Sequence, residues 1–154
     1  MESFILVKPD YVPHSDYLVK TLERLISLQG LSQVLEITGR EAIEKMGRDF
    51  MARFYEPNKD APHFPTVLDH WTGKPSEVIW LEGGFAFKDT FKIAGIKTDP
   101  YDCSSYELRG AAKHLIPAAY QGDANQRKLR NIVHRSDPQQ NLERELALLH
   151  ELLD

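Results

Sequence analysis

The residue best placed to do chemistry is His134, which follows the apolar pair Ile132-Val133 and precedes the polar run Arg135–Asp137. Apolar residues followed by polar ones are typical of the end of a buried strand, where sheets tend to place functional groups. An imidazole there is a good nucleophile near neutral pH when one ring nitrogen is held and the other is free. A lone histidine at a strand end more often has a structural role. The residues predicted near His134 must therefore indicate whether it is functional.

A carboxylate on the last predicted helix is a candidate partner for this histidine. Four leucines at helical spacing between Leu142 and Leu153 predict a helix with a buried stripe. At roughly 100° per residue, Glu145 falls about 60° from the centre of that stripe. From this edge its carboxylate can orient His134 and fix its tautomer, as the third member of a catalytic triad does. The alternative is a solvated glutamate at the rim.

Several other kinds of site are excluded. The chain contains no GxxxxGK[ST] phosphate loop, no GxGxxG, no HExxH and no CxxC. The six histidines are scattered, which argues against a zinc site. The single cysteine, Cys103, cannot form an intrachain disulfide. It stands in a polar loop segment without an activating neighbour, so we expect a bystander thiol.

Length and composition predict one soluble globular domain that spans residues 1–154. The formal net charge of −4 argues against broad, nonspecific binding of nucleic acid. No apolar run reaches the roughly 18 residues that a membrane span requires. The N-terminus lacks the basic start and the long apolar stretch of a signal peptide. We therefore expect a cytoplasmic protein that does not contact a membrane.

Hydrophobic spacing predicts the elements that must position the histidine. Short apolar runs predict four strands, at 4–7, 33–37, 78–81 and 132–133. Helical stripes predict helices over 18–26, from Thr38 or Gly39 to Phe54, over 67–71, over 87–94 and at the C-terminus. Ser136 and Asp137 fall at the turn before the last helix, where their side chains are expected to cap it.

The order of these elements predicts the fold class. It is an α/β chain, more closely an α+β sandwich of the ferredoxin-like βαββαβ type, with additions. One four-stranded, largely antiparallel sheet is expected to be covered by helices. Residues 97–109 are expected to form a loop, and residues 111–128 show no clear pattern.

Six short segments occur in the same order, and at compatible spacing, in one known family. They are Phe4–Asp10 with its Lys-Pro-Asp ending, Phe54-Tyr55 with Lys59–Pro65, Glu82-Gly83, Thr98–Pro100, Leu108–Gly110, and Asn131–Asp137. Glu145 stands eleven residues after His134, at the position of the family's glutamate. Along nearly its whole length the chain resembles the nucleoside diphosphate kinases.

The resemblance implies an activity. His134 would take the terminal phosphoryl group of a nucleoside triphosphate such as ATP or GTP and pass it to a diphosphate such as ADP or GDP. This ping-pong exchange would run through phosphohistidine, with Mg²⁺ carried by the nucleotide phosphates rather than by protein ligands. The family also self-associates, as dimers, tetramers or hexamers. The reaction asks the protein mainly for positioning and for positive charge.

The resemblance also assigns residues. His134 would act with Lys8, Ser136 and Glu145 as the catalytic set. The residues implied around the nucleotide are Lys8, Tyr55, His63, Phe91, Thr98, Arg109 and Asn131.

Departures from the family pattern concern the same site. Phe91 stands where the family has an arginine that contacts phosphate. His63 replaces the phenylalanine that stacks on the base; a histidine stacks with less apolar area. Val67 stands at the other apolar contact to the base. Arg135 replaces the glycine after the nucleophile, where it would either crowd the site or supply positive charge.

An insertion of about twelve residues falls within 111–130, between Arg109 and His134. It is interpreted either as a lid or altered subunit contact, or as a tolerated surface insertion. Three basic residues near its end are candidates to replace the missing charge: Arg127, Lys128 and Arg130.

Two other functions are alternatives to an active kinase. Phe91 and Arg135 motivate a catalytically weak relative that binds nucleotides and serves a regulatory role. A βαββαβ nucleic-acid-binding domain would need exposed aromatic and basic residues interleaved on adjacent strands. The predicted strands lack that pattern, so no nucleic-acid partner is expected.

Overall fold

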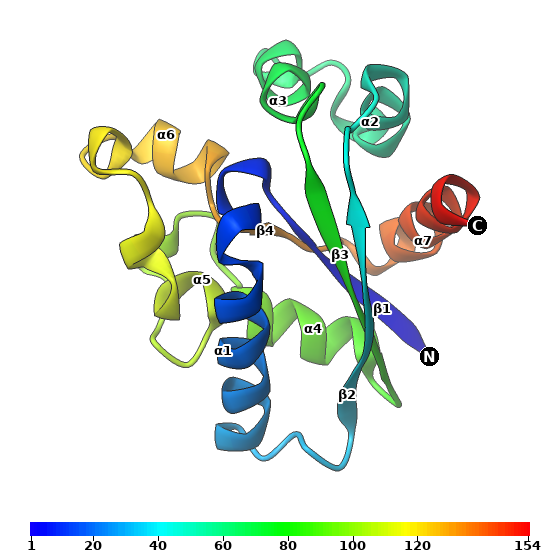
Figure 1. The fold of residues 1–154 in the computed structure, drawn as a ribbon, viewed down its shortest axis with the longest axis vertical. Coiled ribbons are helices and arrows are strands. Elements are labelled where there is room, and N and C mark those ends of the chain that lie inside the picture. The colour runs from blue at the N-terminus through cyan, green and yellow to red at the C-terminus, as the bar shows by residue number, and fades with distance from the viewer.

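Four antiparallel strands form one sheet at the centre of the computed structural model, which describes residues 1–154 (Figure 1). The strands are β1 (Glu2–Val7), β2 (Leu35–Ile43), β3 (Ser76–Gly83) and β4 (Val133–His134). Their order in the sheet is β2-β3-β1-β4, and each neighbouring pair is antiparallel. The βαββαβ arrangement expected from the element order is confirmed.

Seven α-helices surround the sheet. They are α1 (Ser15–Leu28), α2 (Arg48–Phe54), α3 (Phe64–Trp71), α4 (Ala86–Ala94), α5 (Leu108–Ala111), α6 (Ala124–Leu129) and α7 (Gln139–Leu153). Short 3₁₀ segments occur at Pro9–His14, Glu56–Asn58, Pro100–Asp102, Lys113–Leu115 and Ala118–Tyr120. None of the helices combines the length and the apolarity that crossing a bilayer requires.

The central strand β1 is buried on both faces, which explains its continuous run of apolar residues. Ile5 and Val7 join a core with residues of α1, α4 and α5. Phe4 and Leu6 point to the other face, where they join a core with residues of α2, α3 and α7. The alternation of side chains along one strand therefore connects two helical layers through the sheet.

The first helix follows its predicted stripe closely. Leu18, Leu22 and Leu25 are buried at helical spacing, and α1 ends at Leu28. Gly30 then adopts φ +71°, a left-handed conformation that glycine reaches at little steric cost. The helices predicted over 67–71, over 87–94 and at the C-terminus are also present.

The helix predicted from Thr38 or Gly39 is wrong over its first half. Residues up to Ile43 continue β2 and pair with β3, with a register shift between Ile37 and Gly39. Helix α2 begins only at Arg48. Ile43 is buried, so it fits a helical stripe, but it equally suits the buried end of a strand. Pairing with β3 decides between the two patterns.

The predicted caps of the last helix are also absent. Pro138 occupies the N-cap position of α7, and no side chain caps the helix there. Ser136 is buried with its hydroxyl oxygen unpartnered. Asp137 contributes its backbone carbonyl instead, which accepts a hydrogen bond from the Asn141 side chain at 2.9 Å.

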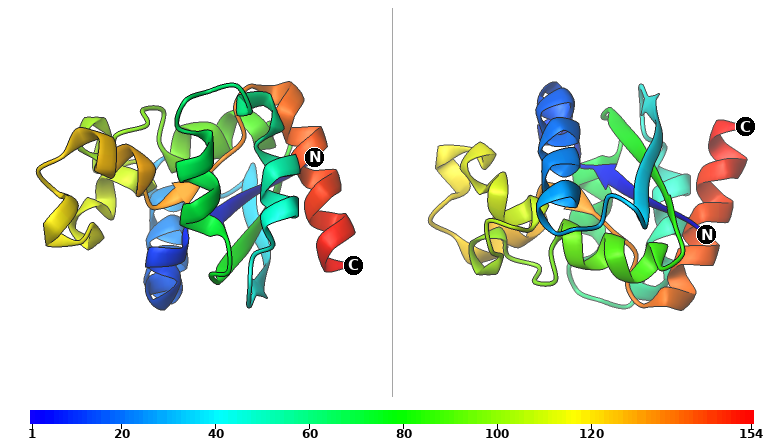
Figure 2. Two further views of the ribbon diagram at one scale, coloured as in Figure 1. Left: turned by 90° about the horizontal axis from the view of Figure 1, so that it is seen from above. Right: turned by 90° about the horizontal axis from the view of Figure 1, so that it is seen from below.

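Residues 111–130 gather at the end of the molecule away from helix α7 (Figure 2). The segment contains two 3₁₀ turns and helix α6, which is capped by the Asp123 carboxylate. This structure was not apparent in the sequence, because its elements are too short to show a period.

Gly110 in helix α5 gives a test of how tightly this region packs. A Cβ at Gly110 would lie 1.9 Å from the backbone oxygen of Ser104, an atom that cannot move aside easily. We expect Gly110→Ala to lower the free energy of unfolding by about 3 kcal/mol, measured by urea denaturation. Gly122→Ala is the matched control, since a Cβ there meets nothing within 4 Å. Equal stability of the two variants would contradict the packing described.

Candidate active site

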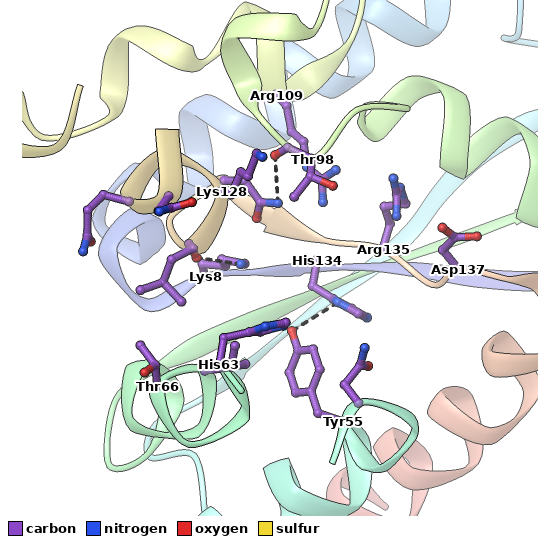
Figure 3. Close-up of a pocket in the computed structure, with 16 residues that line it drawn as sticks. Lys8, Tyr55, His63, Thr66, Thr98, Arg109, Lys128, His134, Arg135 and Asp137 are labelled. Atoms are coloured by element: carbon purple, nitrogen blue, oxygen red, sulfur yellow. Dashed lines mark hydrogen bonds between the residues drawn. The ribbon is translucent and has the colours of Figure 1, made fainter. Parts of the chain in front are cut away.

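A pocket of about 740 Å³ opens where β1, β4 and the segments around α3, α5 and α6 meet (Figure 3). Sixteen residues line it. Those predicted from the sequence to serve catalysis or to bind nucleotide are Lys8, Tyr55, His63, Thr98, Arg109, Asn131 and His134. The fold therefore brings together side chains that are far apart in the sequence, from Lys8 after β1 to His134 in β4.

The predicted pair of His134 and Glu145 is present. His134 Nε2 lies 2.5 Å from Glu145 Oε1, and both side chains are largely buried. An ionised carboxylate only accepts hydrogen bonds, so Nε2 carries the proton and donates it. The other ring nitrogen, Nδ1, lies 3.2 Å from the Tyr55 hydroxyl and accepts a hydrogen bond from it. The unprotonated nitrogen is thus on the Tyr55 side of the ring, toward the pocket (Figure 3).

Aromatic rings fix the plane of this imidazole. Phe54 meets it edge-on with 5.0 Å between ring centroids, and Phe4 stacks near it at 6.1 Å. Burial lowers the pKa of His134, while the Glu145 carboxylate acts in the opposite direction. The net shift is downward from the usual value of 6.5, so the ring is neutral at pH 7.

Glu145 is more deeply placed than the sequence indicated. It was expected at the edge of the buried stripe of α7, and it is only 3% exposed. Leu142, Leu148 and Leu149 form the buried face around it, whereas Leu146 is only partly buried. The interpretation of Glu145 as a solvated rim glutamate is wrong.

Lys8 projects from the end of β1 into the pocket floor. Its ammonium donates a hydrogen bond to the backbone oxygen of Leu129 at 2.8 Å and lies 6.0 Å from the Trp71 ring centroid. Burial, followed by repulsion from Arg109, lowers its pKa to about 7. The charge of this lysine is therefore sensitive to pH near neutrality.

Arg109 is held by backbone carbonyls. Its guanidinium donates to the oxygens of Gly95, Lys97 and Val133 at 3.2, 3.0 and 2.8 Å. The side chain packs so closely on Gly95 that a Cβ there would lie 2.8 Å from it. Burial, with a contribution from Arg135, lowers the pKa of Arg109 to about 9. The Val133 carbonyl immediately precedes His134, so Arg109 also supports the backbone next to His134.

Asn131 and Thr98 are joined on the same wall. The Asn131 amide donates to the Thr98 carbonyl at 3.1 Å, and its own side-chain oxygen is buried without a partner. Between Asn131 and the strand, Ile132 adopts φ +79°, which is rare for a β-branched residue. Ile132 is fully buried, so the surrounding core holds this conformation.

Phe91 does not line the pocket, contrary to its prediction as a nucleotide-binding position. Its ring instead supports Arg135, whose guanidinium lies 4.0 Å from the ring centroid. Arg135 also donates to the carbonyls of Gly95 and Ile96. The arginine that replaces the family's glycine is thus folded onto α4 and the turn after it, at the pocket wall.

Ser136 differs from its predicted role beside His134, whereas Cys103 differs only in its burial. The Ser136 hydroxyl has no hydrogen-bond partner, so it makes no hydrogen bond to His134. Cys103 is buried rather than part of an exposed polar loop, and its thiol donates to the carbonyls of Lys97 and Asp99. Burial raises the pKa of this thiol, which agrees with an unreactive role.

Several lining residues were missed by the sequence analysis. They are Asn58, Thr66, Asn125, Gln126, Leu129 and Asp137. Asp137 was predicted only as a cap of the last helix. Asn125, Gln126 and Leu129 belong to the insertion, where no pattern indicated a helix. The Asp123 N-cap signal, followed by a short polar run, was the one local hint of α6.

Fold and site together define a class of protein: an α+β sandwich in which a carboxylate-held histidine faces a cationic pocket suited to phosphoryl transfer. The family model described as nucleoside diphosphate kinase matches residues 1–152. The chain belongs to the nucleoside diphosphate kinase family.

Individual relatives agree with this assignment. A nucleoside diphosphate kinase of Pyrococcus furiosus is 31% identical over 146 residues, which cover 95% of this chain and 80% of the relative. One of Rhodococcus opacus is also 31% identical, with 95% and 91% covered. The crystal structure of a nucleoside diphosphate kinase family protein from Babesia bovis superposes with a TM-score of 0.69 at 26% identity, covering 96% and 86%.

The His134–Glu145 pair predicts a titration. Burial should place the His134 midpoint below 6.5, and Glu145→Gln should lower it further because the raising charge is lost. His150 is the internal comparison, since its bond to Glu2 raises its pKa. NMR titration of the histidine ring protons measures both. A His134 midpoint above that of His150 would contradict the assignment.

Proposed function

We propose that this protein transfers the terminal phosphoryl group of a nucleoside triphosphate to a nucleoside diphosphate through a phosphohistidine at His134. One observation carries the proposal. Glu145 holds Nε2 of the imidazole at 2.5 Å, which leaves Nδ1 unprotonated at the pocket, where its lone pair is available once the Tyr55 hydroxyl donates elsewhere. A neutral, oriented imidazole is the form that attacks phosphorus.

The exchange takes two steps. The Nδ1 lone pair forms a bond to the γ-phosphorus, and the bond from that phosphorus to the bridging oxygen breaks, releasing the diphosphate. A terminal oxygen of a second diphosphate then attacks the phosphohistidine and breaks the nitrogen–phosphorus bond. The Glu145 carboxylate stabilises the positive charge that the imidazole carries while phosphorylated.

The shape of the pocket suggests how the nucleotide lies in it. The phosphates must reach His134, near Arg109 and Thr98, while Lys8 and Asn131 lie within the same pocket for the sugar and phosphates. The nucleoside then extends toward α3, where His63, Thr66 and Val67 line the opposite end. His63 offers a ring face for stacking on the base.

Mg²⁺ fits this arrangement when it is bound mainly by the phosphates of the nucleotide. The pocket contains a single carboxylate, Asp137, and nowhere do three His, Cys, Asp or Glu residues cluster as metal ligands. Phosphate oxygens would supply most of the coordination, with Asp137 as the protein's own oxygen donor. Bound there, Mg²⁺ supplies neutralisation of phosphate charge. The chain's residues contribute the positioning.

We also propose that residues 1–154 act as one domain, in the cytoplasm and as a self-associated protein like the family at large. The pocket draws on residues from Lys8 to Asp137, which supports a single unit. The second candidate, a weak regulatory relative, is less well supported. It rests on Phe91 in place of an arginine and on Arg135 in place of a glycine, and the stacking of Arg135 on Phe91 argues against the second of these.

Phosphorylation at His134 is tested directly with γ-labelled ATP and Mg²⁺. We expect an acid-labile, base-stable label on the protein that GDP removes as labelled GTP. His134→Ala should abolish the label, because no other histidine of the pocket is held by a carboxylate. His150→Ala should keep it, because His150 lies outside the pocket and is bonded to Glu2. An unlabelled wild type would refute the proposal, and a labelled His134→Ala protein would refute the nucleophile.

Glu145→Gln tests the orienting role separately. Loss of a charge-assisted hydrogen bond should slow phosphorylation roughly 10- to 100-fold in single-turnover measurements. Glu143→Gln, an exposed glutamate on the same helix, is the matched control and should leave the rate unchanged. If both variants react at the wild-type rate, Glu145 does not orient the nucleophile.

A further inference from the structure

The pocket contains four basic side chains, and three of them are already engaged. Lys8 donates to the Leu129 carbonyl. Arg109 donates to three backbone oxygens, and Arg135 donates to two and stacks on Phe91. Each of these cations keeps at least two N–H groups for a ligand, but its position is fixed by the backbone oxygens that it already binds.

The fourth is Lys128, on helix α6 within the insertion. It is exposed, and its ammonium makes no hydrogen bond and no ion pair with the protein. Figure 3 shows Lys128 on the same wall as Thr98 and Arg109, opposite His63 and Thr66. It is therefore the one free cation among the residues that line the pocket.

The neighbours of Lys128 fix helix α6 in place. Arg127 pairs with the Asp99 carboxylate at 2.9 Å and lies over the Tyr101 ring. Arg130 pairs with Asp10, and its carbonyl accepts a hydrogen bond from the Tyr11 hydroxyl at 2.6 Å. The backbone on either side of Lys128 is thus anchored, and a preorganised group loses less entropy on binding.

We propose that Lys128 contacts the phosphates of the bound nucleotide, so that residues 111–130 are part of the binding site. The inference rests on the proposed function and extends it to a residue of the insertion. A lysine ammonium is a compact charge on a flexible stem, and it suits a phosphate group whose orientation changes between substrates. Arg127 and Arg130, the other two candidates in the insertion, are committed to carboxylates.

The charge balance of the pocket supports this assignment. Nucleoside di- and triphosphates bring several negative charges, and Asp137 adds one more. Lys8 is only partly charged near neutrality, because its pKa is about 7. The free ammonium of Lys128 at the pocket wall adds the positive charge that Lys8 supplies only in part.

Equilibrium binding tests the role of Lys128 without requiring turnover. Affinities of a nucleoside, its diphosphate and its triphosphate are measured by calorimetry on the His134→Ala protein, which has no nucleophile to phosphorylate. Adding Lys128→Ala should weaken di- and triphosphate binding about tenfold and leave nucleoside binding unchanged. Lys128→Arg should restore most of the affinity. The loss should be equal for adenine, guanine, cytosine and uracil nucleotides.

Lys92→Ala is the matched control, since Lys92 is an exposed lysine outside the pocket. An equal loss in Lys92→Ala, no loss in Lys128→Ala, or a loss confined to one base would each overturn the proposal. The last outcome would assign Lys128 to the base instead. The labelling experiment tests the kinase function separately. If Lys128 contributes to phosphate binding but His134 is not labelled, the result contradicts phosphoryl transfer and leaves the role of Lys128 in place.

Discussion

The hydrogen bond between His134 and Glu145 connects a strand of two residues to the C-terminal helix, and the geometry of the site depends on it. Burying a carboxylate is costly unless its oxygens are satisfied. One oxygen accepts from His134, and the Arg144 guanidinium lies 3.9 Å from the other. Arg144 also donates to the carbonyls of Arg53 and Phe54, so the same arginine ties α7 to the end of α2. The carboxylate, the histidine and Tyr55 after α2 are therefore positioned as one unit.

The short strand β4 needs support from outside the sheet. It contributes only two residues to the pairing with β1, and the left-handed conformation of Ile132 interrupts the strand just before them. Two other hydrogen bonds hold this short segment in place. The Lys8 amide donates to the Ile132 carbonyl, and the Arg109 guanidinium donates to the Val133 carbonyl. Arg109 is thus a structural support for the strand that carries His134 as well as a cation in the pocket. Its burial, which lowers its pKa, follows from that double role.

Patterns that depend on one element were predictable from the sequence. The apolar run of β1, the stripe of α1 and the location of Glu145 on α7 each follow from a local period, and each is present. The failures depend on contacts between elements. Ile43 fits the apolar spacing of a helix that continues to Phe54, and only pairing with β3 makes residues 38–43 a strand. The resemblance predicts Phe91 at the nucleotide, but its ring stacks against the Arg135 guanidinium instead.

The insertion shows why sequence alone could not choose among its basic residues. Arg127, Lys128 and Arg130 fall within four positions, and composition treats them alike. On a helix, residues three apart lie on nearly the same side, whereas adjacent ones differ by about 100°. Arg127 and Arg130 therefore both face the body of the protein, where Asp99 and Asp10 receive them. Lys128 lines the pocket and forms no salt bridge with either carboxylate. Two salt bridges thus select which cation of the insertion stays free, and they do so through helical geometry and two aspartates more than 25 residues distant in the chain.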